Sequence, residues 1–301
     1  MTMNSMNQAM TRTRFACRVL PRRCGLALIL TLMTAAAARA QVAVISPTLV
    51  ERSVRPGEVY QDSINIHNSS GVAQIVSLTL ADYRFQADGE TEFAAPNTLP
   101  RSNAAWIALS QPRLTVLPKQ DVTVPYTVHV PADASTVGTY WSVVLVEAER
   151  AASGASVPSG FSVTPRLRYA VQLAMHAGAS GEPLLVFGEP ALSRTGFTAQ
   201  IRTGDGASPM AAAASMDDFL TVDVGDAGTR GCRPTFRLEV YQADGTLVHS
   251  ATVSRGLLYP GTSIRQRFGL PRLPAGDYLV LLLADVGRDA VQATKFQVRV
   301  P

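Results

Sequence analysis

Apolar and polar residues alternate with a period of two in about half of the β-rich segments of this chain, and helical periodicity is nearly absent. In one long segment every second residue is apolar, namely Val122, Val124, Tyr126, Val128 and Val130. Because successive side chains of a strand point to opposite faces, this pattern predicts strands with one buried and one solvated face. Pro and Gly interrupt the apolar runs every ~8–15 residues, a spacing typical of β-sandwiches.

The pattern predicts an all-β fold of two tandem immunoglobulin-like sandwiches. In the first half the expected strands are 42–46, 59–68, 73–83, 105–109, 113–117, 121–130 and 138–149, with a last strand inside 161–176. In the second half they are 184–187, 197–203, 219–224, 233–242, 247–253, 263–270, 276–284 and 293–300. A hinge is expected from Gly178 to Pro183, so the predicted domains are 41–178 and 179–301.

Residues 1–40 have the composition of a secretory leader. A basic stretch ends at Arg22 and Arg23, an apolar run follows, and small residues end with Ala38, Arg39 and Ala40. The apolar run of about 14 residues is short for a membrane span of about 20, although an uncleaved anchor is the alternative. The pattern predicts a signal peptide at 1–40 and an exported protein.

The positive charge of the chain is concentrated in this leader. The whole sequence has 27 basic and 23 acidic residues, for a net charge of +4, and six of the arginines lie in residues 1–40. The remaining chain has 21 basic and 23 acidic residues, a net charge of −2. This balance excludes the basic surface of a nucleic-acid-binding protein.

Residue patterns for catalysis or metal binding are not found in the sequence. The four histidines are scattered, and no nucleophile elbow or phosphate-binding glycine loop occurs. Cys232 is the one cysteine beyond the leader, and a buried, unreactive role is expected for it. The acidic positions Asp217, Asp218, Asp223 and Asp226 match no calcium-loop spacing and predict a solvated loop. We therefore expect no enzyme activity, no cofactor and no metal.

The order of features in the first half resembles that of the PapD-like periplasmic pilus chaperones, which are exported proteins of two immunoglobulin-like domains. The resemblance covers about 130 residues and is carried by short segments, namely 56–58, 64–68, 106–107, 114–118, 130–131, 138–141 and 143–147. It implies a periplasmic, non-enzymatic chaperone or assembly factor for pilus-like or other β-rich surface subunits. It also implies outer-membrane assembly machinery as a further partner.

The resemblance implies a binding strand as well. In that family a strand with alternating apolar residues, preceded by a flexible loop, completes the incomplete sheet of a subunit through main-chain hydrogen bonds. The matching positions here are Phe161, Val163, Leu167, Tyr169 and Val171, with Pro165 interrupting the pairing. Their structural alternative is a plain core strand.

The same family holds the terminal carboxylate of the subunit with two basic residues, a task that suits charge-assisted hydrogen bonds. By position the candidates are Arg52 together with Arg166 or Arg168, where the family has one lysine. The structural alternative for these arginines is a solvated sheet face.

A second function stays open at this point. The chain also resembles the immunoglobulin-like peptidoglycan-binding modules of WxL-type surface proteins, and segments 257–261 and 273–278 of its second half resemble modules that follow them. The alternative function is therefore a periplasmic or cell-surface module that binds cell-wall polymer or another protein. Trp106, Tyr140 and Trp141 could then stack on sugars, although aromatic residues of a sandwich more often fill its core.

Overall fold

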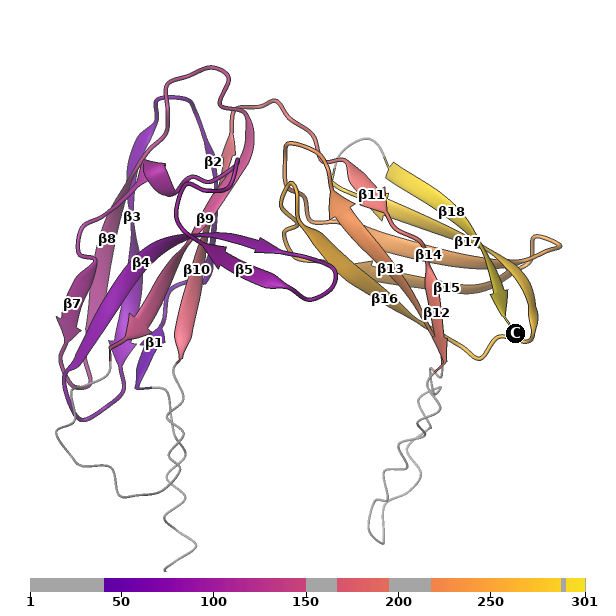
Figure 1. Ribbon diagram of the computed structural model, residues 1–301, viewed down its shortest axis with the longest axis horizontal. Helices are drawn as coiled ribbons and strands as arrows, with labels where there is room; N and C mark the ends of the chain where they lie inside the picture. Colours follow the sequence, from indigo (N-terminus) through magenta and orange to yellow (C-terminus); the bar gives the residue numbers. More distant parts are fainter. Residues whose placement is uncertain (1–40, 150–166, 195–217, 288–290, 301) are drawn as a thin grey trace, which may run out of the picture. The chain divides into compact units, whose positions relative to one another are not determined.

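The described part of the chain is all-β and forms four sheets, which face each other in pairs as two immunoglobulin-like sandwiches (Figure 1). This confirms the predicted fold class. The structure is a computed structural model that describes residues 41–149, 167–194, 218–287 and 291–300. The predicted signal peptide, the predicted strand 197–203 and Asp217 lie outside the described residues. Within the described ranges no helix is long and apolar enough to cross a membrane.

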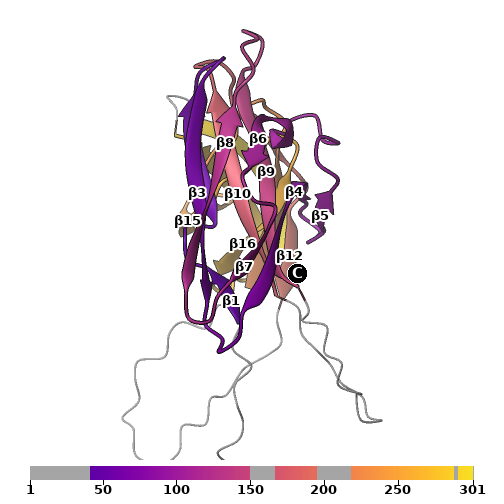
Figure 2. The same cartoon turned by 90° about the vertical axis from the view of Figure 1, so that its left-hand side faces the viewer.

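The first sandwich pairs a sheet of order β1–β3–β8–β6 with a sheet of order β2–β10–β9–β4–β5, and β7 pairs with β4 (Figure 2). A short 3-10 turn, Ala104–Trp106, leads into β6. The strands are β1 (Val42–Val44), β2 (Leu49–Val54), β3 (Val59–Asn68), β4 (Gln74–Phe85), β5 (Thr91–Ala94), β6 (Ile107–Leu109), β7 (Arg113–Val116), β8 (Asp121–His129), β9 (Gly138–Ala148) and β10 (Arg168–Ala177).

The core of the first sandwich follows from the period-two alternation. Ile64 of β3 lies opposite Val124 of β8, and both are buried together with Ile66 and Tyr126. Burying such side chains contributes about 1.5–3 kcal/mol each, which fixes which face of each strand points inward. The strand predicted at 59–68 is confirmed with these bounds, and the strand predicted at 121–130 ends one residue earlier.

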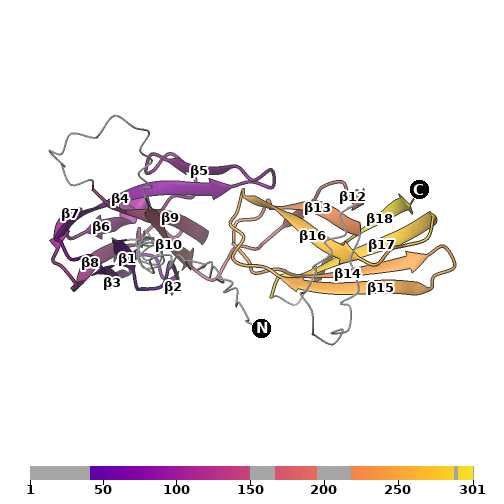
Figure 3. The ribbon, with the colours of Figure 1, turned by 90° about the horizontal axis from the view of Figure 1, so that it is seen from below.

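The second sandwich consists of two sheets (Figure 3). In one sheet β11, β12 and β16 all pair with β13, and the other sheet has the order β15–β14–β17–β18. Its core includes Phe236, Leu220 and Phe268, all buried. Residues 242–246 form a tight turn, with Gly245 at a φ of 85°. The strands are β11 (Leu185–Phe187), β12 (Ala191–Arg194), β13 (Asp218–Asp226), β14 (Thr235–Gln242), β15 (Leu247–Ser254), β16 (Ser263–Leu270), β17 (Gly276–Asp285) and β18 (Val291–Val300).

Three short strands were not expected from the sequence, namely β2, β5 and β12. Strand β2 contains the consecutive polar residues Glu51, Arg52 and Ser53, so it lacks the alternation that marks its neighbours. It forms because its backbone pairs in parallel with β10. Tertiary pairing therefore determines this strand, since local propensity does not favour it.

The segment that follows β10 is held by one side chain. The guanidinium of Arg230 donates hydrogen bonds to the carbonyl oxygens of Ala177, Gly178 and Ser180 at 3.2, 2.7 and 2.7 Å. A second close contact joins β9 to the second sandwich, where the Thr139 N–H donates to the carbonyl of Thr229 at 2.9 Å. The predicted division at 178–179 lies in this segment and stays a prediction.

Candidate functional site

Strand β10 has a different neighbour on each edge. On one edge it pairs antiparallel with β9 along its whole length, from Arg168 opposite Glu147 to Ala177 opposite Gly138. On the other edge it pairs in parallel with β2, but only from Gln172 onward. Among the described residues, no strand pairs with this second edge at residues 168–171. The first part of β10 is therefore an open edge at one end of the first sandwich (Figure 1).

The orientation of the backbone shows which groups the open edge presents. The N–H of Gln172 donates to the carbonyl of Thr48 at 2.8 Å, so the backbone groups of Gln172 point toward the β2 side. Because these groups alternate along a strand, those of Ala170 and Arg168 point to the same side. Each of these two residues therefore offers one N–H and one carbonyl to an added strand, without loss of any bond to β9.

The side chains of this segment divide between the core and solvent. Val171 is fully buried in the core of the first sandwich, and Tyr169 packs against that core half-buried. Leu167 precedes the strand and is 50% exposed, so it does not continue the buried face that its spacing predicts. Arg168 is exposed and donates to the carboxylate of Glu147 at 2.9 and 3.1 Å. Phe161, Val163 and Arg166 lie outside the described residues.

The structure does not bring Arg52 and Arg168 together. Arg52 lies opposite Met175 on β2, seven residues along β10 from Arg168, which corresponds to about 23 Å at about 3.3 Å per residue. Its guanidinium lies over the ring of Tyr60, 3.9 Å from the centroid, and pairs with Glu58 at 3.4 Å. A single carboxylate could not contact both arginines.

A polar network that sequence reasoning missed lies at the other end of β10. His176 Nε2 is 2.8 Å from Glu51, and His176 Nδ1 is 2.8 Å from the hydroxyl of Thr139. The second sandwich completes the network, since Gly231 N–H donates to the Thr139 hydroxyl at 2.8 Å and Arg233 donates to Glu51 at 2.5 Å. These residues are far apart in the sequence, so no local spacing could have identified them.

The carboxylate of Glu51 is the charged centre of this network. Burial raises its pKa, but the hydrogen bonds from His176 and Arg233 outweigh burial and hold the pKa below the ordinary value of 4.5. The ionised form therefore joins the two sandwiches through one carboxylate.

We expect Glu51→Gln to destabilise the protein at neutral pH and to lose this effect in acid. A lowered pKa in the folded state means that the stabilisation is complete above the ordinary value of 4.5 and is lost as the pH falls through the lower folded value. Urea unfolding of Glu51→Gln and of the unchanged protein between neutral pH and about pH 3 measures this effect. The difference between their free energies of unfolding should become smaller in acid. A difference that stayed constant or grew on acidification would contradict it.

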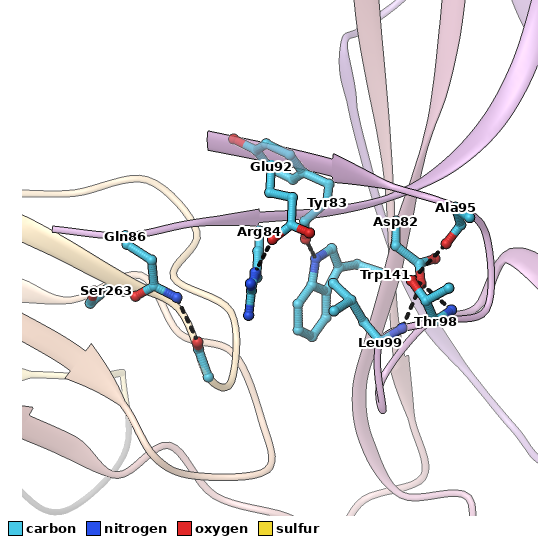
Figure 4. Close-up of polar contacts among 11 residues, drawn as sticks. Asp82, Tyr83, Arg84, Gln86, Glu92, Ala95, Thr98, Leu99, Trp141 and Ser263 are labelled. Atoms are coloured by element: carbon cyan, nitrogen blue, oxygen red, sulfur yellow. Dashed lines mark hydrogen bonds and ion pairs between the residues drawn. The ribbon is translucent and has the colours of Figure 1, made fainter. Parts of the chain in front are cut away.

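The aromatic residues considered as a sugar-binding platform are buried. Trp106 and Trp141 are 8% and 5% exposed. The ring of Trp141 stacks on Tyr259 at a centroid distance of 4.6 Å, and its indole N–H donates to the carbonyl of Tyr83 at 2.6 Å (Figure 4). Trp106 packs against Tyr140 at 4.8 Å. Neighbouring residues cover these indole rings, which agrees with the expectation that such aromatic residues fill the core of a sandwich.

The remaining candidates for chemistry also have structural roles. Cys232 is buried, and burial together with the nearby Asp226 raises the pKa of its thiol to about 12. The solvated loop predicted for the acidic positions is wrong for Asp218, Asp223 and Asp226, because all three lie on β13. Asp223 pairs with Arg265 at 2.7 Å, and the buried Asp226 accepts the N–H groups of Leu184 and Gly228. In the part of the chain that the structure describes, no group of three or more His, Cys, Asp or Glu could hold a metal ion.

A buried carboxylate on β4 organises the loop before β6. Asp82 is fully buried and accepts the N–H groups of Asn97, Thr98 and Leu99 at 3.2, 2.8 and 2.7 Å. Figure 4 shows Thr98 and Leu99 beside this carboxylate. The hydroxyl of Ser102 donates to it as well, at 2.5 Å. These donors fix the connection that runs beside the β4–β5 hairpin.

Comparisons with known proteins find that the chain is similar to solved pilus chaperones at low sequence identity. No protein-family model and no curated protein matches the sequence. A chaperone–tip adhesin complex of CFA/I fimbriae biogenesis is similar at 10% identity and a TM-score of 0.43, over 87% of this chain and 100% of that chain. The CsuC–CsuE chaperone–tip adhesion subunit complex of Acinetobacter baumannii Csu pili is similar at 9% identity and a TM-score of 0.40, over 75% of this chain and 90% of that chain. The SafA pilin–SafB chaperone complex of Salmonella enterica is similar at 12% identity and a TM-score of 0.38, over 86% of this chain and 96% of that chain.

Proposed function

We propose that this protein is a non-enzymatic chaperone or assembly factor, exported to the periplasm, that binds pilus-like or other β-rich surface subunits by edge-strand pairing. The observation that supports this proposal is the open edge of β10 at residues 168–171. An exposed row of backbone donors and acceptors is a template for pairing with another chain, and folded proteins usually cover or interrupt such edges.

The chemistry of this edge suits an incomplete or unfolded β-subunit. A subunit strand laid beside Arg168 and Ala170 would satisfy the backbone groups of both partners at once, independently of the subunit sequence. The exposed side chain of Leu167 would add an apolar contact beside those bonds. The same edge pairing would cover the exposed, unpaired strand of the subunit and so prevent its aggregation.

Capture of partners from a periplasmic extract tests this proposal. We expect the immobilised protein to retain a β-rich subunit in stoichiometric amount, and Leu167→Asp to weaken this capture about tenfold, because it places a charge where apolar contact is expected. Leu117→Asp is the matched control, since Leu117 is also 50% exposed but lies directly after β7, away from β10. Equal capture by the protein and both variants would overturn the assignment of the site.

A further inference from the structure

Strand β17 is apolar on both of its faces. Tyr278, Val280, Leu282 and Ala284 belong to the buried core of the second sandwich. The residues between them, Leu279, Leu281 and Leu283, point to the opposite face because side chains alternate along a strand. Leu279 is 41% exposed, and the other two leucines are partly exposed. A strand that is apolar on both faces is typical of a sheet that is covered on both sides.

These three leucines, called the leucine stripe below, lie in the middle of their sheet. Strand β17 runs between β14 and β18 (Figure 3). The register defines three rows across the outer face, Arg237–Leu283–Ala293, Glu239–Leu281–Lys295 and Tyr241–Leu279–Gln297. The leucine stripe is therefore a continuous apolar strip bordered by polar side chains at each position except Ala293, which is the composition of an interaction surface.

The central row has opposite charges on its two sides. Glu239, on β14, is mostly buried, accepts the hydroxyl of Tyr241 at 2.7 Å and pairs with Arg237 at 2.5 Å. Lys295, on β18, is exposed, and no described residue forms an ion pair with it. An acid thus borders the leucine stripe on one side, and an unpaired base borders it on the other.

This arrangement of charges is complementary to itself. If two such sheets pack face to face about a two-fold axis parallel to β17, β14 of one copy covers β18 of the other, so Lys295 faces Glu239 of the second copy. A two-fold axis running across the strands would instead place Lys295 against Lys295. The nearby pairs Arg237–Glu239 and Arg299–Asp277 leave little excess of one sign that would select a partner of opposite charge.

We propose that the outer face of the sheet β15–β14–β17–β18 binds a second copy of this chain. The leucine stripes of the two copies pack against each other about a two-fold axis parallel to β17. Two ion pairs between Lys295 and Glu239 border the contact. This surface is separate from the open edge of β10, so dimer formation and subunit capture can be tested independently.

Sedimentation velocity of the purified protein over a range of concentrations tests this proposal. We expect a monomer–dimer equilibrium that Leu281→Asn weakens at least ~100-fold, because the substitution places a polar amide at the centre of the contact. Val186→Asn is the matched control, since Val186 is 54% exposed but lies on β11 in the opposite sheet, and it should leave the equilibrium unchanged. Thermal melting checks that both variants fold.

Lys295→Gln tests the direction of the two-fold axis. An axis parallel to β17 predicts about tenfold weaker dimers, because the pair with Glu239 of the second copy is lost, whereas an axis across the strands predicts tighter dimers. A monomer at every concentration, equal effects of Leu281→Asn and Val186→Asn, or tighter dimers with Lys295→Gln would each overturn the proposal as stated.

Discussion

Ala170→Pro should reduce subunit capture about 100-fold while the fold stays intact. The N–H of Ala170 points to the open edge of β10, as the bond of Gln172 to Thr48 indicates. Proline removes that N–H and places its ring where a subunit strand would lie, so an acceptor of the subunit would stay unsatisfied. Proline is tolerated on edge strands because no existing ladder bond is lost, and the pairing with β9 does not use this N–H.

The comparison uses capture from a periplasmic extract, quantified by mass spectrometry. Ala170→Ser keeps the N–H and serves as the matched control, so it should capture as much subunit as the unchanged protein. Circular dichroism and thermal melting report whether Ala170→Pro folds. If the proline variant folds and still captures the same subunit in the same amount, the open edge is not the binding site.

Asp82→Ala should lower the free energy of unfolding by about 3–5 kcal/mol. The carboxylate is fully buried and accepts three backbone N–H groups and a serine hydroxyl, so its removal leaves several buried donors without an acceptor. Each unsatisfied buried group costs about 1–3 kcal/mol, and relaxation of the loop 95–102 would recover part of the loss.

Urea unfolding measures this loss. The free energy of unfolding of Asp82→Asn should lie between those of Asp82→Ala and the unchanged protein. The amide keeps one acceptor oxygen but turns its NH2 group toward other donors. Glu92→Ala is a contrasting control, since Glu92 is an exposed partner of Arg84 in the same hairpin and surface ion pairs contribute little. A free energy for Asp82→Ala within about 1 kcal/mol of the unchanged protein would contradict this role.

Strict alternation made much of the fold predictable. Strands β3 and β16 have the bounds that were predicted for them, because apolar residues two positions apart, Ile64 with Ile66 and Phe268 with Leu270, mark the buried face of each strand. Strand β2 could not be predicted in this way, since Glu51, Arg52 and Ser53 interrupt any alternation and parallel pairing with β10 determines its conformation.

The candidate site was predictable in part. The spacing of Tyr169 and Val171 correctly predicted a strand, but its open edge depends on where β2 stops pairing, which is a long-range property. The network of Glu51, His176 and Thr139 depends on three separate strands for the same reason. The sequence favoured a buried position for Trp141, but it could not predict that Tyr259 of the second sandwich covers this ring.

Amide hydrogen exchange of β10, resolved by residue, tests the central claim most directly. In the free protein the N–H groups of Tyr169 and Val171 should be protected by β9, while those of Arg168 and Ala170 should exchange rapidly. In the complex with a captured subunit, the N–H groups of Arg168 and Ala170 should become protected as well. Rapid exchange of both in the complex would contradict edge-strand pairing at β10.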